Sequence, residues 1–280
     1  MDGFNIIGCD AFNVGSKDFA AGFEFLQKME ASSDFPFISA NIVDNSGKPV
    51  FKTSTILRRG GFSFGVTGAA ASLPEEVSKV SLADVETTVN GVLEDLDTKT
   101  DFQIVLFNGT FKEAEAYRPK FATADYMFVS GVTDLPIGKM KNPTTGPRMY
   151  RLGKQGKSLA FVTMNVETPG KTLADITELK LREEFMQRQI ERMKRSDPSK
   201  TLEELYADDP KLLERAKQIK EALGQMQREL ASAVNTSHFD FSPMDKSLDD
   251  DPRMLGIVSE TLIACDQLEK ASAGGKSTGS

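Results

Sequence analysis

Short apolar runs alternate with amphipathic stretches through residues 1–170, and this alternation constrains the fold more than any other feature of the chain. Runs typical of strands occupy residues 35–41, 50–57, 62–68, 101–107, 126–129, 149–152 and 158–166. Between them, residues 82–96 and 112–121 have the spacing of helices. Strands that alternate with helices predict an α/β protein with a layered mixed sheet. We expect the last two runs to form an antiparallel pair.

Residues 171–235 carry a different pattern, with apolar side chains spaced by three and four. This seam consists of Leu212, Ala216, Ile219, Leu223, Met226 and Leu230. A preceding stretch has compatible spacing at Leu179, Phe185, Met186, Ile190 and Met193. Breaker and cap sequences at 196–199 and 208–210 separate the two stretches. They predict an antiparallel, coiled-coil-like helical hairpin.

Two short helices with apolar seams have little to bury by themselves, so the hairpin is a candidate surface for a protein partner or for self-association. The residues expected to form this surface are Leu179, Met186, Ile190, Met193, Leu212, Ile219, Leu223, Met226 and Leu230. Residues 236–270 are expected to hold a returning strand and a helix that Asp251 caps, with Pro252 in its first turn. Residues 271–280 are low in complexity and are expected to be disordered.

The composition excludes several classes of site. The single histidine, His238, cannot form a multi-histidine metal centre or a Cys₂His₂ zinc site. The net charge of −7 argues against a general nucleic-acid binder, since phosphate neutralisation needs a cationic face. No apolar run is long enough for a membrane span, and the first residues carry no basic segment of a signal peptide. We expect Cys9 and Cys265 to be buried as small apolar residues, and His238 to be a surface or helix-end residue.

Several segments resemble, in order, those of the calcineurin-like metallophosphoesterases, in particular the 5′-nucleotidase branch. Residues 8–22, GCDAFNVGSKDFAAG, are similar to the family pattern G-Y-D-A-x-x-x-G-N-H-[DE]-F-x-x-G. Residues 35–43 and 61–68 follow its F-P-x-x-x-A-N-[IV] and G-x-x-x-[GA]-[VI]-x-G segments. Residues 101–110 and 124–136 match its two following strands. The resemblance implies a metallophosphoesterase-type fold over residues 1–168.

The chain departs from the family at the positions that bind metal. Where the family has a bridging Asn and an acidic His, this sequence has Ser16 and Lys17. Asp18 keeps the acidic position that orients that His in the family. The family's first strand, with its D-x-H motif, would precede residue 1.

Three further metal histidines of the family correspond to Asn108, Val132 and Asp134. A two-metal centre needs several fixed ligands for each cation, and these substitutions remove them. The lysine at position 17 would also repel cations. We therefore expect neither metal nor cofactor, no catalytic residue, and a degenerate domain that serves as a structural or interaction module.

Two alternatives remain open. One is an active, metal-dependent nucleotide phosphoesterase that an upstream segment or another chain completes. The other is a metal-free phosphate or nucleotide binder that uses Lys17, Asn108 and Asp134. The resemblance also implies a periplasmic or extracellular protein, with a signal peptide outside this chain, and a multihaem c-type cytochrome as a partner.

Overall fold

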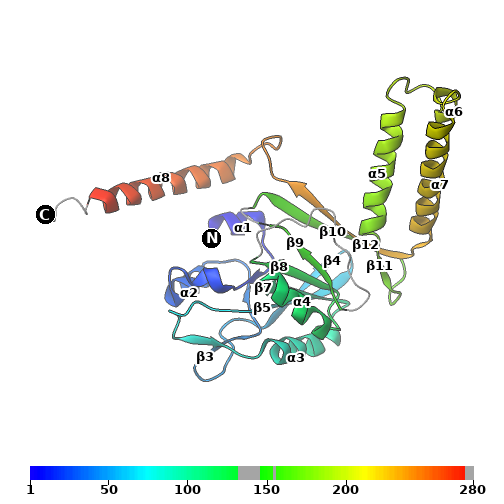
Figure 1. Cartoon of the computed structure of the whole chain (residues 1–280). Coiled ribbons are helices and arrows are strands. Elements are labelled where there is room, and N and C mark those ends of the chain that lie inside the picture. Colours follow the sequence, from blue (N-terminus) through cyan, green and yellow to red (C-terminus); the bar gives the residue numbers. More distant parts are fainter. Residues whose placement is uncertain (132–145, 154–155, 275–280) are drawn as a thin grey trace. The chain divides into compact units, whose positions relative to one another are not determined.

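The computed structural model describes residues 1–131, 146–153 and 156–274, which form two compact units. Of these residues, unit 1 contains 1–131, 146–153, 156–157 and 244–274, and unit 2 contains Ser158–Pro243. The predicted layered α/β fold is confirmed (Figure 1).

A five-stranded mixed sheet is the centre of unit 1. Its strand order is β4-β5-β7-β8-β9. The strands are β4 (Ser54–Arg59), β5 (Phe62–Ala70), β7 (Phe102–Asn108), β8 (Tyr126–Ser130) and β9 (Arg148–Arg151). The β4–β5 pair is an antiparallel hairpin, whereas β5, β7, β8 and β9 run parallel to one another. Parallel strands end at the same edge of a sheet, so this edge gathers the residues that follow them.

Helix α3 (Val85–Asp97) joins β5 to β7, and α4 (Phe111–Tyr117) with the 3₁₀ helix η2 (Arg118–Lys120) joins β7 to β8. The apolar side of α3 is buried together with the strands. Members of this core include Val89, Leu93, Val105, Phe107, Phe121 and Met127.

A second part of unit 1 consists of short elements from the start of the chain. These are α1 (Asp2–Ile7), β1 (Phe12–Asn13), the 3₁₀ helix η1 (Ser16–Phe19), α2 (Phe23–Ala31), β2 (Phe37–Ile38), β3 (Ile42–Asp44) and β6 (Val80–Leu82). β1 pairs with β2 in parallel, and β3 pairs with β6 in antiparallel. Their core contains Val14, Phe19, Leu26, Phe35, Phe37 and Ile42.

Helix α8 (Pro252–Gly274) ends the described part of unit 1. The Asp251 side chain accepts hydrogen bonds from the backbone N–H groups of Arg253 and Met254. The predicted N-cap is therefore confirmed.

Unit 2 is a three-stranded sheet with a helical hairpin. Its central strand β12 (Asn235–Pro243) pairs antiparallel with β10 (Ser158–Val166) and parallel with β11 (Leu173–Asp175). Helices α5 (Thr177–Met193), α6 (Leu202–Leu205) and α7 (Pro210–Ser232) lie between β11 and β12 in the chain. α5 and α7 pack side by side (Figure 1), and Ala216, Ile219 and Met226 of the predicted seam are buried.

The structure corrects the pairing expected for residues 149–152 and 158–166. β9 pairs in parallel with β8, whereas β10 pairs with β12, which follows the hairpin. Apolar alternation identifies a strand but not its partner, so the mistake concerns the pairing alone. The unit boundary also falls at Ser158 rather than at residue 170, because β10 joins the hairpin's sheet.

Two smaller expectations are corrected in part. His238 lies half-buried within β12, so it is not at a helix end. Cys265 is exposed on α8, whereas Cys9 is half-buried.

Candidate functional site

Polar side chains gather where β5, β7 and β8 of the central sheet end. Asn108 is the last residue of β7, and Ser130 is the last residue of β8. The two residues are in register with each other, and Asn108 is in register with Ala70 at the end of β5. Gly15, which caps η1, and Ser16, the first residue of η1, come to the same place.

The side chain of Asn108 connects this loop to β8. Its Oδ1 accepts a hydrogen bond from the backbone N–H of Ser16 at 3.2 Å, and its Nδ2 donates one to Ser130 Oγ at 3.0 Å. The Ser130 hydroxyl also lies 3.5 Å from the carbonyl oxygen of Phe107. Both ends of the Asn108 amide therefore have partners from the chain itself.

The backbone of Gly15 packs directly against the Asn108 side chain. A Cβ atom at position 15 would lie 2.4 Å from Asn108 Cγ, which no side chain can accept. The backbone N–H of Gly15 donates to Asp18 Oδ2 at 2.7 Å, and this bond fixes the loop. Burial raises the pKa of the Asp18 carboxyl above its ordinary value, and the Gly15 bond partly opposes that rise.

Two asparagines that the sequence did not single out, the buried Asn41 and the half-buried Asn13, support the same edge. The Asn41 amide donates to Ala70 O at 2.8 Å and accepts from Ala70 N–H at 3.0 Å. Asn13 Nδ2 donates to Ala69 O at 3.1 Å, while its buried Oδ1 has no hydrogen-bond partner among the described residues. The available signal was a polar residue inside an apolar run, as Asn41 is within residues 37–43.

The structure brings together only some of the predicted site residues. Ser16, Asp18 and Asn108 meet at the sheet edge, whereas Lys17 is exposed on η1. Val132 and Asp134 lie outside the described residues. The proposed phosphate ligands Lys17, Asn108 and Asp134 are therefore not assembled by the described part of the chain.

The described residues at this edge do not fit a di-metal centre. Among them, the side-chain donors are the amide of Asn108 and the hydroxyls of Ser16 and Ser130, and the only described carboxylate, that of Asp18, accepts the Gly15 N–H. Across the described residues, no three His, Cys, Asp or Glu side chains are grouped so that they could hold a metal ion. A two-metal site needs more ligands than these, and more of them negatively charged.

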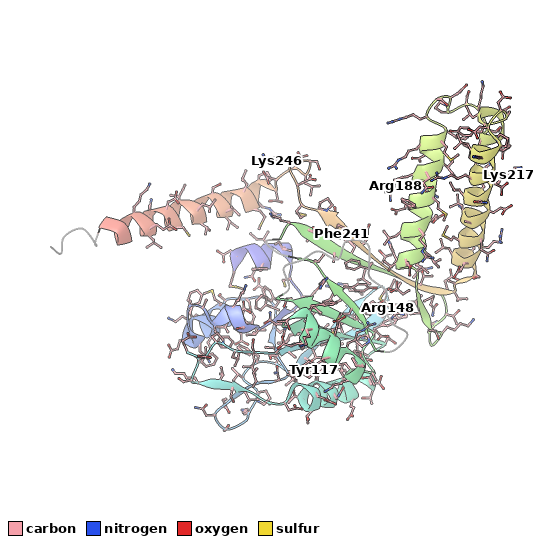
Figure 2. The ribbon with its side chains drawn as sticks, viewed as in Figure 1. Tyr117, Arg148, Arg188, Lys217, Phe241 and Lys246 are labelled. Atoms are coloured by element: carbon pink, nitrogen blue, oxygen red, sulfur yellow. The ribbon has the colours of Figure 1, made fainter. Side chains whose placement is uncertain are left out.

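The predicted interaction residues lie mostly along the seam of the hairpin. Ile219 and Met226 are buried, and Leu179, Met186, Ile190, Met193, Leu223 and Leu230 are half-buried. Only Leu212 of that set is exposed. The large exposed apolar side chains of α5 are instead Leu181 and Phe185, which do not belong to the predicted surface. Figure 2 shows the hairpin side chains, with Arg188 labelled on α5 and Lys217 on α7.

The fold of this chain is similar, over about three fifths of its length, to that of several solved phosphoesterase and nucleotidase structures. The sequence itself matches no protein-family model and no curated protein. The structure is similar to the sulfate thiohydrolase SoxB of Thermus thermophilus, with a TM-score of 0.50 and 21% identity over 57% of this chain and 31% of that one.

Two more solved structures are similar at lower scores. The calcineurin-like phosphoesterase YfkN of Bacillus subtilis has a TM-score of 0.49 and 17% identity, over 60% of this chain and 61% of that one. A 5′-nucleotidase precursor, also of Thermus thermophilus, has a TM-score of 0.47 and 15% identity, over 59% of this chain and 37% of that one. The chain thus spans less than two thirds of each of these proteins. Among the described helices, none has the length and apolarity needed to cross a membrane.

Proposed function

We propose that this chain is a catalytically inactive, metallophosphoesterase-like domain that functions by binding another protein. The single observation that carries the proposal is the hydrogen bonding of the Asn108 side chain. Its side chain holds the position where the family resemblance expects a metal histidine, and both of its polar ends are bonded to Ser16 and Ser130. A ligand at this position would have to break these bonds and displace the Gly15 backbone.

The hairpin supports the second half of the proposal. Since α5 and α7 bury their seam against each other, the hairpin does not need a partner to cover that seam. Leu181 and Phe185 lie one helical turn apart on α5 and stay exposed. Exposed large apolar residues that form a pair on a helix are typical of protein contacts.

Metal analysis and a hydrolysis assay test the first half of the proposal. The full natural protein, with any upstream segment, is purified without chelators, analysed for bound metal and assayed with an aryl phosphate and a nucleotide. We expect no stoichiometric metal, no hydrolysis and a melting temperature that a chelator leaves unchanged. Stoichiometric metal with hydrolysis would establish the active phosphoesterase instead.

A thermal-shift experiment separates the inactive module from a phosphate binder. Millimolar nucleotide or inorganic phosphate should leave the melting temperature unchanged, because ligand that binds the folded state would raise it. A rise that the Lys17→Ala variant abolishes would favour the metal-free binder.

The interaction half is tested on the full chain in its native host. A photo-crosslinking residue at position 185 should give one discrete heterologous adduct. Deletion of residues 175–230, or the pair Leu181→Asp with Phe185→Asp, should abolish association with the protein identified in that adduct. Gln187→Asp, an exposed position elsewhere on the same helix, is the matched control and should retain it. Association that persists without the hairpin would overturn this half of the proposal.

A further inference from the structure

Strand β10 lies at the edge of the sheet of unit 2, and one of its two sides has no strand beside it in the described part of the chain. The strand order is β10-β12-β11, and β10 pairs with β12 over its whole length. Among the described residues, none forms a backbone hydrogen bond to the other side of β10. Such an edge can take up a further strand through its backbone N–H and C=O groups.

The hydrogen bonds of β12 show which residues of β10 are directed to this open side. The Phe239 N–H donates to Thr177 Oγ1, away from β10. The Ser237 C=O likewise accepts from Ile176 N–H. In an antiparallel pair, the residues opposite Phe239 and Ser237 are then directed away from β12 as well. These are the even-numbered residues of β10, of which Ser158 is buried and Ala160, Val162, Met164 and Val166 are half-buried.

The sequence of β10 lacks the residues that usually keep an edge strand from pairing. Its nine residues, SLAFVTMNV, include no charged residue, no proline and no glycine. Proteins commonly protect an edge with lysine, proline, a bulge or a very short strand. The odd-numbered side chains Leu159 and Phe161 are also about half exposed. This composition indicates an edge that another strand covers.

Opposite charges flank β10 at its two ends. Lys157 precedes the strand and Glu167 follows it, and both are exposed. Neither forms an ion pair with another of the described residues. Each lies five residues from Val162, so two β10 strands that run antiparallel about Val162 place Lys157 of each copy opposite Glu167 of the other. Parallel pairing in register would instead place like charges opposite each other, which is destabilising.

We propose that β10 pairs antiparallel with β10 of a second copy of this chain, with the two Val162 residues opposite each other. The backbone groups of Ala160 then bond those of Met164 of the other copy, and the two Val162 residues bond each other. Phe161 of each copy lies opposite Thr163 of the other and diagonal to the other Phe161, within reach of an aromatic contact.

This pairing is closed after two copies. It is two-fold symmetric, so the same edge of both chains is used up. The joined sheet then ends on both sides in β11, which has three residues (Leu173–Asp175). A strand this short is a poor template for further pairing, so the expected assembly is a dimer rather than a fibre.

The molar mass of the full chain in solution tests the proposal. At micromolar concentration the wild-type protein should have twice the mass of one chain. Lys157→Glu should raise the dissociation constant about tenfold, because it sets like charges opposite each other at both ends of the strand pair. Addition of Glu167→Lys to that variant should restore the dimer. Lys211→Glu, at an exposed position on the hairpin, is the matched control and should leave the dimer unchanged.

A monomeric wild-type protein, or a dimer that Lys157→Glu leaves unchanged, would overturn the proposal. The hairpin pair Leu181→Asp with Phe185→Asp should leave this dimer intact, so failure here is distinct from failure of the proposed function.

Cross-linking tests the register. In a chain that carries Cys9→Ser and Cys265→Ser, Val162→Cys should give a covalent dimer on a non-reducing gel after mild oxidation. Facing residues of a hydrogen-bonded antiparallel pair have Cα atoms about 5.5 Å apart, which a disulfide can span. Ala160→Cys is the control and should give none, since the two positions 160 would lie four residues apart along the strands, about 13 Å. A covalent dimer through Ala160→Cys, or none through Val162→Cys, would overturn this register.

Discussion

Asn108 Oδ1 lies 3.2 Å from the backbone nitrogen of Ser16, and this hydrogen bond joins the end of β7 to the first residue of η1, near the start of the chain. The other end of the same amide is bonded to Ser130 on β8. One side chain thus connects three segments that are distant in sequence. The residues at this edge are consequently expected to affect stability rather than turnover.

The variant Asn108→Ala should lower the free energy of unfolding by about 1–2 kcal/mol, because it leaves the Ser16 N–H and the Ser130 hydroxyl without their partner. Urea unfolding followed by circular dichroism measures the change. Asn45→Ala, in an exposed turn, is the control and should change stability little. An equal loss in both variants would show that the Asn108 bonds contribute nothing.

Gly15→Ala should destabilise the protein by about 1–3 kcal/mol, since the added methyl group would overlap the Asn108 side chain. The backbone at Gly15 is extended, with φ of −126°, so the cost is steric rather than conformational. The double variant with Asn108→Ala should cost clearly less than the sum of the two single variants.

Gly91→Ala is the matched control for that measurement. Gly91 lies inside α3 with no atom within 4 Å of the added methyl group, so the substitution should stabilise the protein by about 0.5–1 kcal/mol. Additive costs in the Gly15 and Asn108 pair would contradict the close contact between them.

Asp18 should make stability depend on pH in the acidic range. Because burial raises the pKa of this carboxyl in the folded state, the folded protein holds the proton at pH values where the unfolded chain has released it. The contribution of Asp18 therefore falls as pH rises from about 3.9, the ordinary Asp pKa, through the raised pKa, and is lowest above it. Asp18→Asn should flatten the slope of unfolding free energy against pH in that window, and an unchanged slope would contradict the assignment.

Asn235→Ala should be among the costliest polar substitutions in unit 2. The buried Asn235 side chain accepts from the backbone N–H groups of Glu167 and Thr168 and donates to the carbonyls of Thr168 and Lys171. Removal of these four bonds should cost about 2–4 kcal/mol in chemical denaturation. Asn165→Ala, exposed on β10, is the control, and a similar cost there would argue against a special role for Asn235.

Local patterns predicted the elements that depend on local interactions. The spacing from Leu212 to Leu230 predicted α7, and the Asp251–Pro252 pair predicted the start of α8, since capping and amphipathicity act over a few residues. The partner of β10 could not be predicted in this way, because it lies beyond a hairpin and many strands share the same alternation.

The sequence predicted several residues of the candidate site, but not the hydrogen bonds that they form with one another. The sequence identified Asn108 and Ser16 as substituted positions, but it gave no sign that their own hydrogen bonds occupy the edge. These hydrogen bonds depend on the close contact between the Gly15 backbone and Asn108, which holds the segment around Gly15 against the end of β7. Likewise, Leu181 and Phe185 are exposed because the hairpin closes along its other face, and this follows from the packing of α5 on α7.

The position of β12 between β10 and β11 has a consequence for the order of folding. Val166 pairs with Asn235 and Ser158 with Pro243, so β10 leaves the ribosome long before its partner exists. The intervening helices make contacts close in sequence and can form first, which brings Asp175 and Ser237 together and shortens the loop that must close. Until then β10 carries the exposed Leu159 and Phe161 on an unpaired strand, so slow synthesis through α7 should increase aggregation of the nascent chain.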